Sequence, residues 1–232
     1  MCGRYAFDKD VNDLIVDYVA QGGKATDWRP SFSIAPTDPV PIVRERSGDE
    51  GVEREIELAS WGIKPPWFNG AHAPINARLE SVAEKPMFRS AFQGKRAIVP
   101  MTGYYEWTAD GKIKLPHFIS NGGELLSAAG LYEVRKAHDN WLVTFTIITR
   151  SARDASGEVH DRMPVFLTPD VWDQWLSPDK LTAAQNAPTL AMLESSSIAV
   201  AATLTTYRVD RKVNSVRTVD PADATLIRPV DA

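Results

Sequence analysis

Residues 103–119 read GYYEWTADGKIKLPHFI, two runs of strand-forming residues separated by Asp110-Gly111. An Asp-Gly pair is among the strongest short-range signals for a tight β-hairpin, because both residues tolerate the positive φ that such turns require. Aromatic and β-branched residues, which favour strands, dominate both flanking runs. This stretch therefore predicts two antiparallel strands joined by a short turn.

Similar runs extend this pattern along the chain, and they predict strands over 39–43, 55–61, 96–100, 125–133 and 141–149. Helical spacing or composition predicts helices over 8–20, 77–84, 86–92 and 170–176, with a weaker signal over 189–194. The composition of residues 21–41, rich in Gly and Pro, predicts a loop. Strands joined by turns, with irregularly inserted helices, predict one α+β domain around a largely antiparallel, strongly bent sheet.

The composition, 44% hydrophobic and 24% charged residues in 232, is typical of a folded globular chain. One cysteine excludes an intramolecular disulfide, and no signal-peptide pattern is present, so we expect a cytoplasmic protein. No apolar run approaches the ~20 residues of a membrane-spanning helix. We therefore expect no membrane partner.

The formal net charge of −4 argues against a protein that coats nucleic acid through its overall charge. The stretch 62–105 departs from this average, because it holds six basic residues and two acidic ones, a local charge of 6 − 2 = +4. It also holds Trp67, Phe68, Phe88 and Phe92. Cations interleaved with aromatic rings suit a single-strand groove, whereas core rings beneath a solvated charged face explain the pattern equally well.

Cys2, the only cysteine, directly follows Met1. If Met1 is removed, the new terminus carries an α-amine of pKa near ~8 beside a thiol of pKa near ~8.5, so that both are partly deprotonated at neutral pH. Such a 1,2-aminothiol captures an aldehyde as an imine and closes it to a thiazolidine ring. The alternative is an inert, buried cysteine that acts as a small hydrophobic residue.

Glu106 is a single carboxylate within the aromatic run Tyr104-Tyr105-Glu106-Trp107. Strand alternation places it on the same face as Tyr104. A carboxyl group surrounded by rings tends to have a raised pKa, which suits a general acid or base near neutral pH. The alternative is an edge-strand glutamate that points into water.

Two further polar positions are candidates for the site. Asn76 precedes the expected helix 77–84, where it would cap the helix or hold an anion or a substrate oxygen. His160 lies just before a strand and is followed by Asp161 and Arg162; a surface histidine is the alternative, and Arg162 could pair with Asp161 or with a phosphate. The spacing of these positions is not diagnostic, since catalytic groups meet in space.

The sequence lacks Cys-x-x-Cys, His-Glu-x-x-His, a phosphate loop and a dinucleotide fingerprint. These are the signatures of common metal and nucleotide sites. We therefore expect neither a metal nor a cofactor.

Taken together, the motifs resemble those of the SRAP family, the SOS-response-associated peptidases or abasic-site-processing proteins. The resemblance runs from Cys2 to about Asn214, so we expect an SRAP domain over 2–216 and a C-terminal tail over 217–232. It rests on MCGRY (1–5), IAPT (34–37), WGI (61–63), PW (66–67), NAR (76–78) with Glu80, KP (85–86), FR (88–89), GYYEW (103–107), AGLYE (129–133), IIT (147–149) and HDRMP (160–164).

This resemblance implies that Cys2, once Met1 is lost, crosslinks to the ring-opened aldehyde of an abasic site in single-stranded DNA. In such proteins the residue matching Glu106 assists proton transfers, that matching His160 positions or protonates the sugar and supports reversal, and that matching Asn76 orients the reacting groups. AP-lyase activity is a further expectation. The expected DNA contacts are Arg4, Trp67, Arg78 and Arg162, in a protein that acts as a monomer.

Two other functions stay open. The family's older name suggests a cysteine peptidase, in which His160 or the protein's own amine would activate Cys2; such an enzyme also needs an oxyanion hole. A non-catalytic module for single-stranded DNA would keep Trp67 and the arginines but has no use for Cys2.

Overall fold

The computed structural model describes residues 2–18, 20, 25, 27–49, 51–137, 140–152 and 159–230. In this part of the chain the strands are β1 (Tyr5–Phe7), β2 (Ser31–Ile34), β3 (Pro39–Gly48), β4 (Gly51–Trp61), β5 (Asn76–Arg78), β6 (Arg96–Met101), β7 (Gly103–Asp110), β8 (Ile113–Ser120), β9 (Leu126–Ala137), β10 (Asn140–Ser151), β11 (Arg162–Pro164) and β12 (Thr205–Arg208). The α-helices are α1 (Val11–Asp17), α2 (Arg89–Gly94), α3 (Trp172–Leu176) and α4 (Ala183–Ala201), and short 3₁₀ turns include η1 (Leu79–Ser81), η3 (Pro169–Val171), η4 (Arg211–Asn214) and η5 (Ala224–Ile227).

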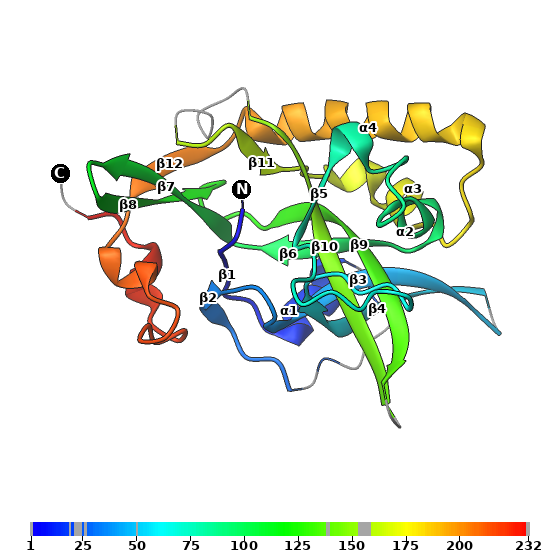
Figure 1. Ribbon diagram of the computed structural model, residues 1–232, viewed down its shortest axis with the longest axis horizontal. Coiled ribbons are helices and arrows are strands. Elements are labelled where there is room, and N and C mark those ends of the chain that lie inside the picture. Colours follow the sequence, from blue (N-terminus) through cyan, green and yellow to red (C-terminus); the bar gives the residue numbers. More distant parts are fainter. Residues whose placement is uncertain are drawn as a thin grey trace.

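The strands form two mostly antiparallel sheets, which confirms the predicted α+β class and the single domain (Figure 1). One sheet has the order β12-β8-β7-β1-β2. In the other, the pairings β10-β4-β3-β6-β9 close into a ring, because β9 also pairs with β10. Closure leaves few free edges among these strands, and β5 and β11 both pair with β10 at the rim.

The predicted hairpin is confirmed. Residues 103–110 pair antiparallel with 113–120, in a register that ends at Asp110↔Ile113. Gly111 has φ of 58°, in the left-handed region that glycine enters without a Cβ clash. All five other predicted strands are also present, each lengthened by one to five residues at one or both ends, although β9 begins one residue later than predicted.

Strand β1 ties the start of the chain to β7. Tyr5 lies opposite Tyr104, and Ala6 lies opposite Gly103. The Tyr105 amide donates to the Arg4 carbonyl at 2.9 Å, and the Thr102 amide donates to the Ala6 carbonyl at 2.8 Å. This pairing brings the first residues of the chain beside the strand that carries Glu106.

Both faces of β7 are covered by hydrophobic residues. Tyr104 belongs to the main core, whereas Tyr105 belongs to a second, smaller cluster on the other face with Phe118 and Leu226. Leu226 lies in η5, so the expected tail 217–232 is packed against the domain over its described residues. The amide of Phe32 donates to the Pro221 carbonyl at 2.7 Å, which fastens this segment to β2.

Several local predictions were wrong because tertiary pairing overrode local preference. The helix predicted over 77–84 is instead β5, which pairs with β10, followed by one 3₁₀ turn. The loop predicted over 21–41 contains β2, although 21–24 and 26 lie outside the described residues. The weak helical prediction over 189–194, in contrast, is confirmed as part of the 19-residue α4, whose full length was not predicted because Pro188 lies inside it.

The helix predicted over 8–20 is confirmed in its centre as α1, which Asp10 caps through a capping box with Asp13. The prediction over 86–92 overlaps α2, and that over 170–176 corresponds to η3 and α3. Within the described residues, no helix is both long and apolar enough to cross a membrane.

We predict that Gly103→Ala destabilises the fold. A Cβ at this position would lie 2.6 Å from the Ile119 carbonyl oxygen and would also overlap the Phe118 ring. Overpacking of this kind typically costs roughly 1–3 kcal/mol. Urea unfolding should show this loss, whereas the control Gly94→Ala, with open space around its Cβ, should unfold like the wild type. Equal stability of the two variants would contradict the close packing at Gly103.

Candidate active site

Cys2 lies in the interior at the start of the chain. Its side chain has 0% exposure, and its Sγ lies 4.0 Å from the Arg4 carbonyl oxygen. Burial raises the pKa of the Cys2 thiol, and the nearby charge of Glu106 raises it further. In this chain, which retains Met1, the thiol is therefore protonated at neutral pH.

Asn76 contacts Cys2 directly. Its Nδ2 donates to the Cys2 carbonyl oxygen at 2.8 Å. Asn76 lies on β5, opposite Ile147 of β10, and so does not cap a helix as the sequence suggested. Its Oδ1 is buried and has no hydrogen-bond partner among the described residues. The amide thus holds the backbone of Cys2 and keeps one acceptor available.

Glu106 is buried, with 3% exposure. Burial raises the pKa of its carboxyl group to about 7, and the negative charge of Asp161 adds to the rise. The prediction of a raised pKa is confirmed, and an edge-strand glutamate in water is excluded. A carboxyl group with this pKa exchanges protons readily near neutral pH.

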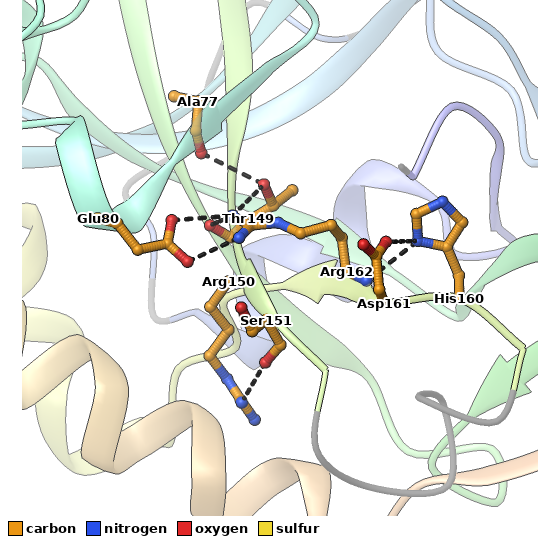
Figure 2. A network of polar contacts seen from close by, with 8 residues as sticks. All are labelled: Ala77, Glu80, Thr149, Arg150, Ser151, His160, Asp161 and Arg162. Carbon is orange, nitrogen blue, oxygen red and sulfur yellow. Dashed lines mark hydrogen bonds and ion pairs between the residues drawn. The ribbon is translucent and has the colours of Figure 1, made fainter.

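His160 precedes β11 and is half-buried. The backbone amide of Arg162 donates to His160 Nδ1 at 3.0 Å, and Asp161 Oδ1 lies 3.0 Å from the same nitrogen (Figure 2). Burial lowers the pKa of His160. The charge of Asp161 raises the pKa of both His160 and Glu106, and so it acts on both side chains.

Arg162 is a buried side chain that connects β11 to η1 and β10. It is 8% exposed, and its Nη1 and Nη2 donate to the two carboxylate oxygens of Glu80 at 2.6 and 3.1 Å. Nη2 also donates to the Thr149 carbonyl at 2.6 Å, and Figure 2 shows the side chain between Glu80 and β10. Burial alone would raise the pKa of Glu80. The hydrogen bond that Arg162 donates to the Glu80 carboxylate instead holds this pKa below its ordinary value. These contacts fix β11, and the expected DNA contact of Arg162 stays a prediction.

Arg4 is also internal, with 5% exposure. Its Nη1 donates to Ser33 Oγ and to the Val213 carbonyl, both at 3.0 Å. These bonds tie β1 to β2 and to η4, and the expected DNA contact of Arg4 stays a prediction. Burial lowers the pKa of its guanidinium group.

Trp67 and Arg78 lie at the surface. Trp67 is 58% exposed, and Arg78 is exposed on β5. Strand alternation places Arg78 on the same side of β5 as Asn76, about 7 Å along the strand. The cation of Arg78 and the ring of Trp67 are thus accessible, and Arg78 lies on the same strand as Asn76.

The other basic residues of 62–105 differ in exposure: Lys85 and Arg89 are exposed, whereas Arg96 is buried. Arg96 is 2% exposed and donates to the carbonyls of residues in α2 and α3 and just beyond them. Phe88 and Phe92 belong to the core, as the alternative interpretation held. Burial of Arg96 removes one of the six positive charges of this stretch from the surface.

The described residues hold no cluster of three or more His, Cys, Asp or Glu side chains that would bind a metal ion. Sequence reasoning did not identify Glu80 or Asp161 as contributors to the site. Glu80 lies near Arg78 in the sequence, but its partner Arg162 is distant. Asp161 follows His160 directly, but Glu106, on which its charge acts, is distant as well.

Comparisons with known proteins agree on one family. A family model described as SOS response associated peptidase (SRAP) matches residues 1–216. Abasic site processing protein YoaM of Bacillus subtilis is 35% identical over 188 residues, covering 77% of this chain and 80% of the relative. Abasic site processing protein YedK of Escherichia coli is 28% identical over 181 residues, 76% of this chain and 79% of the relative.

Solved structures share the fold. A protein from Bacteroides thetaiotaomicron has a TM-score of 0.79 at 24% identity and covers 99% of this chain and 100% of its own. A phage-related protein from Bordetella bronchiseptica has a TM-score of 0.66 at 27% identity, covering 90% and 94%. The sheets described above are thus a recurrent arrangement.

The two arginines should differ in their effect on stability. We predict that Arg162→Ala lowers the free energy of unfolding by about 1–3 kcal/mol, because it removes charged hydrogen bonds to Glu80 and Thr149. Arg78→Ala should change it by less than about 0.5 kcal/mol, since Arg78 is exposed. Denaturant unfolding at one pH measures both, and equal values would contradict the internal role of Arg162.

Proposed function

Because this chain belongs to the SOS response associated peptidase (SRAP) family, we propose that it processes abasic sites in DNA. The names of its relatives, abasic site processing proteins, support this role. We propose more specifically that Cys2, after removal of Met1, forms a thiazolidine crosslink with an abasic site in single-stranded DNA. The strongest support is that Cys2 lies at the start of the chain beside Asn76 and within the field of Glu106.

The proposed reaction begins with attack of the Cys2 α-amine on the C1′ aldehyde of the opened sugar. The new C–N bond gives a carbinolamine, which loses water to form an imine. The thiol then adds to the imine carbon, forming a C–S bond, and its proton passes to the nitrogen. The net products are one thiazolidine and one water molecule, so no oxidant or cofactor is consumed. Elimination from the imine would give AP-lyase activity, and the reverse sequence would release the DNA.

Glu106 is suited to the proton transfers of this sequence. As a carboxylate it accepts the proton that leaves the attacking amine, and as a carboxylic acid it protonates the departing hydroxyl group. A pKa of about 7 makes both forms available at neutral pH. It also offers a base for the Cys2 thiol, whose own pKa is raised by burial. We propose that Asn76 fixes the Cys2 backbone and that His160 protonates or orients the sugar.

The exposed side chains Trp67 and Arg78 supply the proposed DNA contacts. Arg78 would pair with a phosphate beside the lesion, and Trp67 would stack on an unpaired base. This selectivity for single strands follows because bases in a duplex are already stacked. We further propose that the protein acts as a monomer in the cytoplasm, where a lone thiol stays reduced.

The two alternatives have less support. A cysteine peptidase works through a thiolate, whereas burial raises the pKa of Cys2 and leaves it protonated. A simple single-strand binding module would need neither a buried glutamate of pKa about 7 nor an amide that holds Cys2. Self-removal of Met1 would account for the peptidase name without a separate substrate.

We predict that incubation with an abasic single-stranded oligonucleotide increases the intact mass of the protein without Met1 by the mass of the DNA minus one water. Cys2→Ala should give no stable adduct, although borohydride should trap an imine on its free amine. An undamaged oligonucleotide is the control. Crosslinking by protein that retains Met1 would contradict the proposal, because an acylated amine forms no imine.

Glu106→Gln should bind abasic DNA like the wild type but crosslink roughly 10²-fold more slowly, the typical loss for a general acid or base. Because the first proton transfer needs the carboxylate, the wild-type rate should rise with pH up to about 7. The variant should lack this inflection. Single-turnover crosslinking between pH 5.5 and 8.5 measures both, and a wild-type rate in the variant would assign Glu106 a structural role only.

A further inference from the structure

The hydrogen bond at His160 Nδ1 defines the protonation of the imidazole. A backbone amide only donates, and the amide of Arg162 points at Nδ1 from 3.0 Å. Nδ1 must therefore present a lone pair, which places the proton of a neutral imidazole on Nε2. In this state Nε2–H is a donor, and Nδ1 is an acceptor.

The carboxylate of Asp161 makes a conflicting demand on the same nitrogen. Its Oδ1 also lies 3.0 Å from Nδ1, within hydrogen-bonding distance (Figure 2). Two acceptors do not bond, so this contact is favourable only when Nδ1 carries a proton. The two short contacts are thus alternatives, one for each state of Nδ1.

The partners of His160 differ in how firmly they are held. The backbone of Arg162 is fixed because its side chain joins Glu80 and Thr149. The Asp161 side chain, in contrast, is 88% exposed, and its contact in Figure 2 is with His160 alone. The contact from the Arg162 amide therefore favours the imidazole that is protonated at Nε2 only. The exposed Asp161 carboxylate can move to accept a hydrogen bond when Nδ1 carries a proton.

We propose that Asp161 is a positioning residue that holds the Nδ1–H form of His160 and thereby lets Nε2 give and take the proton used on the abasic sugar. This inference rests on the proposed function, because the sugar is its substrate. In the donating step the Nε2–H bond of the imidazolium breaks and an O–H bond forms on the sugar. Nδ1–H stays bonded to Asp161, and solvent supplies the next proton to the half-exposed ring.

The charges around His160 are mixed. Burial of the ring opposes its protonation, and among the described residues the charge of Asp161 favours protonation, whereas the charge of Arg162 opposes it. Asp161 also raises the pKa of Glu106, so it acts on both proton-transfer groups. Because its carboxylate is exposed, the ion pair contributes little to folding. Loss of Asp161 should therefore change titration and rate while leaving stability nearly unchanged.

The test is Asp161→Asn in the full chain, compared with Asp161→Glu and with Asp170→Asn, an exposed aspartate in η3. Long-range ¹H–¹⁵N NMR of the imidazole, assigned with His160→Gln, reports both tautomer and titration. We expect Asp161→Asn to move the His160 titration to lower pH and to remove the Nδ1–H form. Asp161→Glu should restore both, and Asp170→Asn should have no effect.

The rate of crosslink reversal below pH 6.5 should fall about 10-fold in Asp161→Asn. In metal sites, removal of the carboxylate that holds a histidine ligand lowers activity by about this factor. The midpoint of thermal unfolding should stay within about 1 °C of the wild type, as for exposed substitutions. An unchanged His160 titration, or an equal rate, would overturn the inference. If wild-type protein forms no abasic crosslink, the proposed function fails, while the NMR result still decides whether Asp161 controls His160.

Discussion

The pairing of β1 with β7 is the constraint on which the site depends. Two backbone hydrogen bonds, at 2.8 and 2.9 Å, fix residues 4–6 along the strand that carries Glu106. The three residues from Tyr5 back to Cys2 span at most about 10 Å when extended. The thiol and any terminal amine therefore remain near Glu106 without a further anchor, and the bond from Asn76 only orients them.

Burial raises the pKa of both Cys2 and Glu106, and burial of the Glu106 carboxyl group also reduces the stability of the fold. Burial on the face of β7 that also carries Tyr104 of the main core removes water from Glu106, so its neutral form persists to about pH 7. A carboxyl group in such a place is less favourable for folding than one in water. Groups of this kind concentrate where proton transfer is required.

The arginines illustrate how one residue type takes different roles. Arg4 and Arg162 donate to a serine, to carbonyls and to Glu80, and so connect strands that are distant in sequence. Arg78 has the same charge but lies exposed on β5. Arginines in the sequence thus serve cohesion of the domain in some positions and stay available to a partner in others, and only exposure in the folded structure separates the two.

The sequence by itself determined the hairpin at 103–119, five further strands, the α+β class and the candidate residues Cys2 and Glu106, because alternation, turn residues and reactive groups are local properties. It did not determine β1, β2 or β12, which are too short to show a period, or β5, where a helical composition pairs with β10. The partners of Asn76 and Arg162 lie 74 and 82 residues away. Only the tertiary structure decided those roles, because burial and hydrogen-bond partners arise when distant strands meet.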